Sequence, residues 1–202
     1  MTGQHIDAGQ AIALGLAGWH IEAAQQGAAW ESLSSLEWSH ANALDAWLKT
    51  FTEAAQPSTP YPDMPTWNLI NLHFSHPTVG GILQSLEDDP QVWAQDTASG
   101  LRKRSPLMLH VALEHVRRAR TMSLAEDLRM ERDMVRHCFH SAHLGRSGAD
   151  TDTVEGIRAL VIDKDQNPRW NPARVEDVTP DMVEPFFQSP WPVFAHPLKD
   201  LV

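Results

Sequence analysis

Three histidines and the only cysteine stand close together in the stretch HCFHSAH, where their types and spacing suggest metal chemistry. His137, His140 and His143 recur at steps of three beside Cys138, and residues three apart are neighbours on the surface of a helix. A structural zinc needs four ligands, and the thiol projects about 100° away from His137 around a helix. We interpret the stretch as a partly exposed helix end and predict no metal site.

Glu131 is the carboxylate best placed for acid–base chemistry. It lies at the edge of the apolar positions of a predicted helix, and a half-buried carboxylate is what a general base requires. Its neighbours Arg129 and Arg132 offer a simpler explanation, which is an ion pair on the surface of that helix. We favour the ion pair.

Two basic runs could attract an anionic ligand such as a phosphate. RKR occupies residues 102–104 and RRAR occupies residues 117–120. Such runs on amphipathic helices are more often solvated surfaces, and we favour that interpretation. The sequence contains no G-x-S-x-G, Walker, G-x-G-x-x-G or H-E-x-x-H motif, so these patterns identify no catalytic constellation.

The elements that must position these residues are mostly helices. Asp7 is suited to cap a helix that Gly15 ends, and the strand-like LAGWHI follows at residues 16–21. Four prolines instead predict an extended crossing at residues 56–66. Apolar spacings of three and four predict the further helices. They cover residues 23–36, 79–86, 92–101 and 180–187, and two more begin at Pro106 and Leu124. Ser39 is expected to cap a helix whose apolar positions run from 43 to 51, and Asp152 or Thr153 the helix that carries Ile157.

The helices of the last hundred residues each show one apolar stripe that we expect to be buried. Ser105 precedes the first, and Ser123 with Glu126 forms a capping box at the start of the second, so the pair resembles a helical hairpin. The stripes are Leu109, Ala112, Leu113, Val116 and Ala119 in the first helix, Ala125, Leu128, Val135 and Phe139 in the second, and Ile157, Leu160 and Val161 in the third.

Composition excludes several classes of protein. The chain has 202 residues, of which 42% are hydrophobic, and a net charge of −10, which is typical of a soluble globular protein and disfavours binding to a phosphate backbone. No apolar run is long enough for a membrane span. With Cys138 as the only cysteine and no signal peptide pattern at the start, we expect a cytoplasmic protein without disulfides, nucleic acid or membrane partners.

Several segments resemble one known family in the same order. EGIRALVIDKDQNPRW at residues 155–170 closely resembles the C-terminal signature of 3-hydroxyisobutyryl-CoA hydrolases, a branch of the crotonase (enoyl-CoA hydratase/isomerase) superfamily. TGQHIDAGQAIALGLA at residues 2–17, the Ser105–Pro106 pair and Glu131 also match. Ordinary hydratases have a markedly shorter connection than the 88 positions between Ala17 and Ser105, which favours the hydrolase branch.

The resemblance implies a mainly α chain, the helical C-terminal portion of a crotonase-like α/β fold, with at most a short strand near residues 16–21. Residues 1–22 would end the core of that fold, 23–104 would form a helical connection, and 105–202 a helical cap. In the family, backbone N–H groups and a Glu–Asp pair that precede the TG segment act on the thioester of 3-hydroxyisobutyryl-CoA in valine breakdown. We therefore carry over no catalytic residue and expect the chain to be inactive alone.

Only the coenzyme A contacts can be placed. In related hydratases a lysine and an apolar residue of the last helix approach the adenine end of coenzyme A, which makes Lys164 and Leu160 candidates. We favour a simpler pairing of Lys164 with Asp163 or Asp165. No cofactor beyond the coenzyme A of the substrate is expected. The alternatives are a non-catalytic helical module that binds a partner, such as an N-terminal half or another copy, through an exposed apolar face, and the hydratase/isomerase branch.

Overall fold

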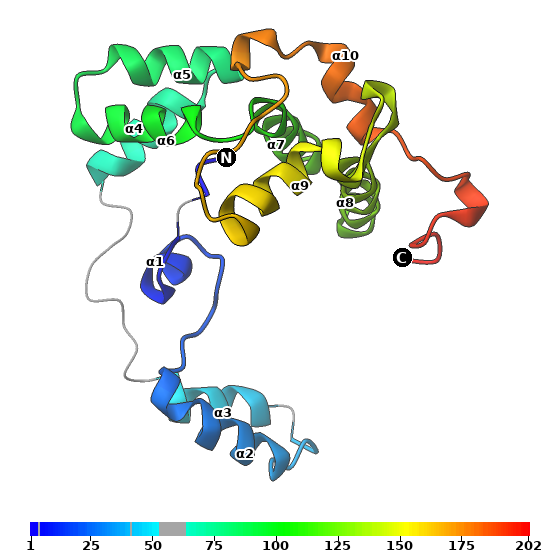
Figure 1. The fold of residues 1–202 in the computed structure, drawn as a ribbon. Coiled ribbons are helices and arrows are strands. Elements are labelled where there is room, and N and C mark those ends of the chain that lie inside the picture. The colour runs from blue at the N-terminus through cyan, green and yellow to red at the C-terminus, as the bar shows by residue number, and fades with distance from the viewer. Residues whose placement is uncertain (4, 41, 53–63) are drawn as a thin grey trace. The chain divides into compact units, whose positions relative to one another are not determined.

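The computed structural model describes residues 1–3, 5–40, 42–52 and 64–202 of the chain (Figure 1). These residues form two compact units, one of Gly3–Asn71 and one of Met1–Thr2 with Leu72–Val202. The mainly helical fold that the sequence predicts is confirmed, because helices dominate both units. The division at residues 22 and 104 refers to a longer family fold and stays a prediction.

The first unit begins with α1 (Ala8–Ala13), whose capping matches the prediction. The Asp7 carboxylate accepts a hydrogen bond from the Gln10 backbone N–H at 2.7 Å, and the Gln10 side chain accepts one from the Asp7 N–H at 2.8 Å. Gly15 then takes φ +70°, a left-handed conformation that costs glycine little. Residues 16–21 form no strand, and without a partner strand in the described residues their backbone groups have no ladder to join.

Three further helices and one short 3-10 turn complete the described part of this unit. They are η1 (Ala23–Gln25), α2 (Gln26–Ser34), α3 (Ala43–Thr52) and α4 (Met64–Phe74), the last of which continues into the second unit. Trp47 of α3 is buried, and its indole N–H donates to the Ser32 hydroxyl of α2 at 2.7 Å. This contact joins α2 to α3.

Helix α4 corrects the prediction of an extended crossing at residues 56–66. The helix begins at Met64, so Pro65 lies in its first turn, where proline is tolerated because the N–H that it lacks has no partner in a helix anyway. The part of the expected crossing at residues 56–63 lies outside the described residues.

The second unit contains four long helices followed by short elements. The long helices are α5 (Val79–Asp88), α6 (Val92–Arg102), α7 (Pro106–Ala119) and α8 (Leu124–Phe139). The short elements are β1 (His140–Ser141), η2 (Ala142–Leu144), β2 (Arg146–Ser147), η3 (Gly148–Asp150), α9 (Asp152–Ile157), the π-helical η4 (Arg158–Ile162), η5 (Val175–Asp177), α10 (Pro180–Val183), η6 (Glu184–Phe187) and η7 (Val193–Ala195). No helix in the described ranges is long and apolar enough to cross a membrane.

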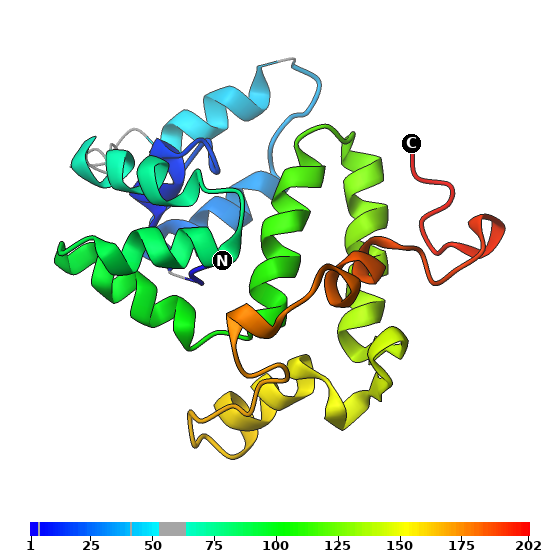
Figure 2. The same cartoon turned by 90° about the horizontal axis from the view of Figure 1, so that it is seen from above.

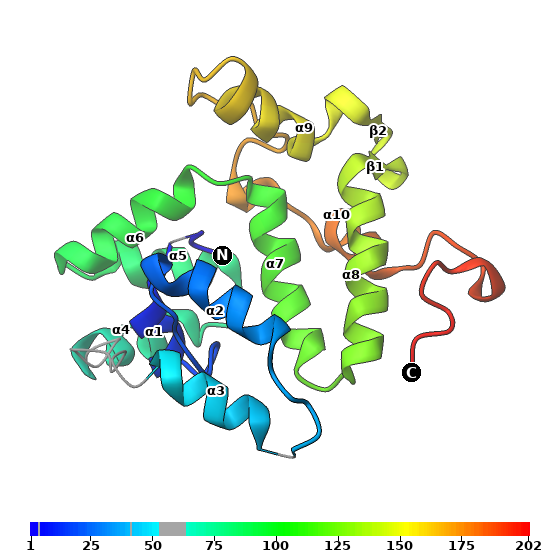
Figure 3. The ribbon, with the colours of Figure 1, turned by 90° about the horizontal axis from the view of Figure 1, so that it is seen from below.

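The caps predicted for α7 and α8 are confirmed, whereas α9 is capped by Thr151 and not by Asp152 or Thr153. The Ser105 hydroxyl accepts from the Met108 N–H at 3.1 Å, and Ser123 and Glu126 form the predicted capping box. Figures 2 and 3 show α7 and α8 side by side, with the α10–η6 segment lying across them. The two-residue strands β1 and β2 pair antiparallel, with His140 opposite Ser147.

Two apolar cores hold the second unit together. In the first core, residues of α5 and α6 pack against Leu109 of α7 and Val175 of η5. The fully buried residues of these two helices include Ile82, Leu86 and Leu101. The other is formed where η6 packs on the helical hairpin, and it consists of Leu107, Val111, Met130, Met134 and Phe186. Helix α7 therefore contributes side chains to both cores.

The burial of three stripes differs from the prediction. In α7 Leu109 is buried as expected, but Val116 is 54% exposed. In α8 both Val135 and Phe139 are about half exposed, at 51% and 41%. In the third helix the whole predicted stripe is partly exposed, with Ile157 at 41%, Leu160 at 48% and Val161 at 63%. The reason in α8 is that the helix is apolar on two sides. Met130 and Met134 face the core, whereas Val135 lies roughly 140° around the helix from Met130.

We expect Phe186→Ala to destabilise the second unit by about 3–5 kcal/mol, because it removes a ring that is 1% exposed at the centre of a core. Urea unfolding of the whole chain measures the change. Phe194→Ala is the matched control, since that ring is 80% exposed. Equal effects of the two substitutions would contradict the described packing.

Candidate functional site

The candidate coenzyme A contacts lie where η4 ends in a charged turn, Asp163, Lys164 and Asp165, which we call the DKD turn. Arg158 at the start of η4 organises it. Its Nη1 lies 2.6 Å from Asp163 Oδ2 and 2.7 Å from Asp165 Oδ2. The same guanidinium reaches back to Glu155 of α9, at 2.9 Å from Nε and 2.8 Å from Nη2. One arginine thus joins the helix to both acids of the turn.

The backbone of the DKD turn is left-handed at two residues that are not glycine. Lys164 has φ 56° and Gln166 has φ 55°, a conformation that costs about 1–2 kcal/mol for an L-residue. Hydrogen bonds hold it in place. The Gln166 N–H donates to the Ala159 carbonyl at 3.1 Å, and the Asn167 N–H donates to the Asp165 carboxylate at 2.9 Å.

Lys164 pairs with neither acid of the DKD turn. Its side chain is exposed and makes no hydrogen bond or ion pair with any residue that the structure describes. Our favoured pairing of Lys164 with Asp163 or Asp165 is therefore wrong, because Arg158 takes both carboxylates. Leu160 is 48% exposed on the same short helix. An exposed ammonium in the turn and a half-exposed apolar side chain on η4 therefore lie close together in the sequence.

Arg158 also lowers the pKa of two of its partners. Its hydrogen bonds, followed by the one from the Arg169 backbone N–H, lower the pKa of Glu155 to about 2. Hydrogen bonds from Arg158 and from the Asn167 N–H likewise lower the pKa of Asp165. These carboxylates are therefore anionic at neutral pH and serve to hold the turn, and neither is suited to act as a general acid there.

The segment that follows the DKD turn is fixed to two helices. The Trp170 indole donates to the Lys103 carbonyl at 3.0 Å, and its ring packs so closely on α9 that a Cβ added at Gly156 would lie 3.3 Å from it. Asp152 accepts from the Asn171 N–H at 3.0 Å and from the Ser105 hydroxyl. Burial raises the pKa of Asp152. These contacts join the first turns of α7 and α9.

The three histidines of HCFHSAH have separate partners. His137 Nε2 lies 2.8 Å from the Gln188 carbonyl, His143 Nε2 lies 3.0 Å from the Met182 carbonyl, and His140 Nδ1 lies 2.6 Å from the Ser147 hydroxyl. His137 and His143 also pack against the Phe186 ring. They contribute to packing at the end of α8.

Glu131 does not pair with its arginine neighbours. Arg129 donates to the carbonyls of Leu198 and Leu201, and the Arg132 guanidinium lies 4.8 Å from the centre of the Trp191 ring. Glu131 instead lies 3.6 Å from His115. The expected ion pair with Arg129 or Arg132 is therefore wrong, and the side chain that Glu131 approaches is a histidine of α7.

One arginine of each basic run is paired with two carboxylates. Arg102 pairs with Glu87 at 2.8 Å and with Glu176 at 2.7 Å. Arg118 pairs with Glu114 at 2.7 Å and with Glu184 at 2.6 Å. Both runs therefore resemble the ordinary helix surfaces that we favoured.

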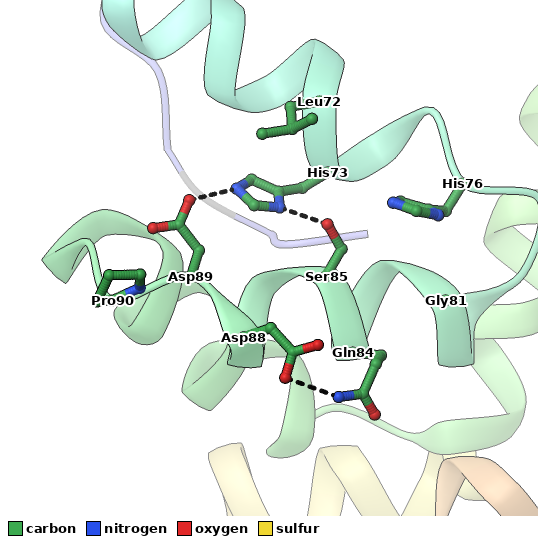
Figure 4. Close-up of a pocket in the computed structure, with 9 residues that line it drawn as sticks. All are labelled: Leu72, His73, His76, Gly81, Gln84, Ser85, Asp88, Asp89 and Pro90. Carbon is green, nitrogen blue, oxygen red and sulfur yellow. Dashed lines mark hydrogen bonds and ion pairs between the residues drawn. The ribbon is translucent and has the colours of Figure 1, made fainter.

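One constellation was missed by sequence reasoning. Figure 4 shows a pocket in which His73 of α4 is hydrogen-bonded to Ser85 of α5 at 2.8 Å and to Asp89 at 3.1 Å. Serine, histidine and aspartate form nucleophile–base–acid triads in hydrolases. Here, however, His73 is only 1% exposed, so a substrate could not reach its ring. Ser85 lies inside α5, where helix hydrogen bonds occupy the neighbouring N–H groups that could stabilise an oxyanion.

We interpret the His73 constellation as a structural link between α4, α5 and the residue that follows α5. Hydrogen bonds from Gln91, the largest of them from its backbone N–H, lower the pKa of Asp89, so its carboxylate is an anionic acceptor at neutral pH. The three residues are 12 and 16 positions apart in different elements. No periodic signal joins them, and the sequence alone could not have identified the contact.

We expect Glu155→Gln to make stability less dependent on pH between about pH 4.5 and 2. The folded pKa of Glu155 lies below its ordinary value, so the unfolded chain binds more protons in that window and the stabilisation is lost as the pH falls. Urea midpoints at pH 7 and pH 3 test this. Asp96→Asn, on the exposed surface of α6, is the control and should keep the wild-type pH dependence.

Comparisons with known proteins agree with the helical architecture. The family model described as enoyl-CoA hydratase/isomerase matches residues 1–187. A probable 3-hydroxyisobutyryl-CoA hydrolase 2 of Arabidopsis thaliana is 30% identical over 93% of this chain and 49% of its own length. The mitochondrial 3-hydroxyisobutyryl-CoA hydrolase of Rattus norvegicus is 35% identical over 59% of this chain and 29% of its own.

The match to a solved structure also covers about half of that protein's chain. A carnitinyl-CoA dehydratase from Mycobacterium thermoresistibile matches with a TM-score of 0.73 and 28% identity, over 95% of this chain and 50% of that one. The chain aligns with the C-terminal half of the hydrolases and spans about half the length of the Arabidopsis relative.

Proposed function

The chain belongs to the enoyl-CoA hydratase/isomerase family, and from this premise we propose that it forms the C-terminal part of an acyl-CoA thioester hydrolase. The proposed substrate is 3-hydroxyisobutyryl-CoA, an intermediate of valine breakdown. The observation that carries the proposal is the similarity to proteins named as 3-hydroxyisobutyryl-CoA hydrolases, which for the Arabidopsis relative extends along 93% of this chain.

In this proposal Lys164 and Leu160 contact coenzyme A. The nucleotide end of coenzyme A carries phosphates, to which a lysine ammonium binds as a point charge, and an adenine ring, which can pack on an apolar side chain. The unpaired ammonium of Lys164 and the half-exposed side chain of Leu160 offer these two features. The Arg158 network supports the proposal because it fixes the backbone from which Lys164 projects.

We propose that the groups that act on the thioester belong to the half of the family fold that this chain does not match. Within the described residues, the one Ser–His–Asp constellation that we identify has a buried imidazole and lacks an oxyanion site. The acids of the DKD turn are engaged by Arg158. The chain alone is then inactive toward thioesters.

We further propose that this other half covers an apolar surface of α8, α9 and η4. Helix α8 contacts α9, and the exposed apolar side chains on these elements include Val135, Phe139, Ile157, Val161 and Ile162. We call them the exposed apolar set. Exposed apolar side chains on adjoining elements are typical of a surface that another protein segment covers. A second copy of the chain is the competing occupant.

The hydratase branch is the second candidate function. It is favoured by the likeness to a carnitinyl-CoA dehydratase, at 28% identity and a TM-score of 0.73. Both branches use coenzyme A thioesters, so the proposed role of Lys164 is the same in each. The products differ, because a hydrolase releases free coenzyme A and a hydratase does not.

A cytoplasmic location is also part of the proposal. It is supported by the single cysteine, Cys138, since a protein without disulfides suits a reducing compartment. Burial raises the pKa of the Cys138 thiol, which keeps it protonated and unreactive at neutral pH. The rat relative is named as mitochondrial, so fractionation of the native cells is the direct test.

We expect Lys164→Ala to weaken coenzyme A binding about fivefold, because an exposed ammonium–phosphate contact contributes roughly 1 kcal/mol. Calorimetric titration of the purified chain with coenzyme A measures this. Lys199→Ala is the matched control, since Lys199 pairs with Asp200 at 2.6 Å. If both variants bind as the wild type does, the assignment of Lys164 is wrong.

We expect the purified chain to release no coenzyme A from 3-hydroxyisobutyryl-CoA, and co-expression with the N-terminal half of the Arabidopsis relative to restore release. A thiol-reactive reagent reports free coenzyme A, and crotonyl-CoA hydration is followed in parallel. Hydrolysis by the chain alone at an enzyme-like rate contradicts the proposal that the groups that act on the thioester lie in the other half of the fold. Hydration without hydrolysis in the co-expressed pair favours the second candidate.

We expect the chain to bind a hydrophobic dye through the exposed apolar set, and Phe139→Ser to reduce the fluorescence of that dye. Phe194→Ser is the control, because Phe194 is 80% exposed but lies on η7 outside the set. Sedimentation at rising concentration reports whether a second copy covers the surface. A dye-free monomer would contradict the proposal that this surface needs a partner.

A further inference from the structure

One cluster of metal-ligating side chains is not used by the proposed function. His115 of α7 faces Asp127 and Glu131, which lie one helical turn apart on α8. His115 Nε2 is 3.2 Å from Asp127 Oδ1 and 3.6 Å from Glu131 Oε1. One ligand atom from each of the three residues lies within 4.8 Å of the other two.

The two distances from His115 Nε2 match the edges of a coordination polyhedron. Two ligand atoms that each bind zinc at about 2.0–2.2 Å in tetrahedral geometry lie roughly 3.4 Å apart. The two measured nitrogen–oxygen distances fall on either side of that value. A cation could be bound by small rotations of side chains that are all at least partly accessible, without a movement of either helix.

The charge of the cluster also favours a cation. Two carboxylates share one imidazole, which even when protonated neutralises only one of them. The arginines that could have supplied the missing charge are used elsewhere. Arg129 donates to the carbonyls of the last residues, Arg132 packs on Trp191, and Arg118 pairs with Glu114 and Glu184.

We propose that His115, Asp127 and Glu131 form a binding site for a divalent transition metal, with zinc as the best fit. Zinc accepts one imidazole nitrogen and two carboxylate oxygens, and three protein ligands leave a fourth position for water. Magnesium and calcium prefer oxygen ligands alone. The bound metal bridges α7 and α8 and stabilises the hairpin. This site is independent of coenzyme A binding.

The sequence prediction of no metal rested on His137, His140 and His143, of which the first lies in the last turn of the same helix and the other two beyond its end. The present site differs from that cluster in two respects. Its ligands come from two helices, and its carboxylates have no other cationic partner among the described residues. The spacing of two acids four residues apart was visible in the sequence, but the third ligand required the hairpin.

The test is a titration of the whole purified chain with zinc, followed by calorimetry and by the melting temperature. We expect one equivalent to bind and to raise the melting temperature reversibly. Cobalt at the same site should give a visible absorption spectrum typical of low coordination number. Glu131→Gln and Asp127→Asn should each weaken zinc binding at least tenfold, and His140→Gln is the control that should leave it unchanged.

Circular dichroism of each variant before zinc is added separates loss of binding from loss of folding, and Glu131→Gln alters an exposed side chain. Two outcomes overturn the proposal. One is the absence of stoichiometric binding, which would leave an ordinary ion pair between His115 and the acids. The other is binding that survives Glu131→Gln and Asp127→Asn but is lost in His140→Gln, which would place the metal on the histidines at the end of α8.

Discussion

The contacts of Arg158 are the constraint on which the candidate coenzyme A site depends. A guanidinium offers five N–H donors in a planar fork, and here they serve Glu155, Asp163, Asp165 and the Asn167 carbonyl. The acids on both sides of Lys164 are thereby occupied, so the ammonium remains available. The same contacts hold Lys164 and Gln166 in left-handed conformations that neither residue favours by itself. A lysine in place of Arg158 could not satisfy this geometry.

The DKD turn can hold Lys164 in place only because α9, to which Arg158 joins the turn, is itself fixed. Asp152, in the first turn of α9, accepts from Ser105 in front of α7 and from the Asn171 backbone, and Glu155 accepts from the Arg169 N–H at 2.6 Å. The segments on both sides of the DKD turn are thus hydrogen-bonded to each other, and Asp152 is hydrogen-bonded to the residue that caps α7. The apolar side chains on the outer faces of α8 and η4 do not take part in this arrangement. Because these side chains are exposed, we propose that a partner segment covers that surface.

Most helices could be predicted from the sequence because the contacts that start them are local. Asp7, Ser105 and Ser123 each cap a helix through a side chain within three residues of its partner, and such signals are readable from one segment alone. Burial was harder to predict. Helix α8 is apolar on two sides, and Met130 and Met134 face inward because they pack with Leu107, Val111 and Phe186 of other elements. The links from His73 to Ser85 and Asp89, and from His115 to α8, join residues of different elements that no period relates.

The most direct test of the central claim, that Arg158 holds the DKD turn in a fixed conformation, is amide hydrogen exchange in the whole chain with and without Arg158→Lys. The Gln166 N–H, which donates to the Ala159 carbonyl at 3.1 Å, reports the turn. We predict that this amide exchanges slowly in the wild type and rapidly in the variant, while amides of α5 and α7 remain protected in both. Equal protection of Gln166 in the two proteins would show that the turn holds its shape without Arg158 and would contradict this account.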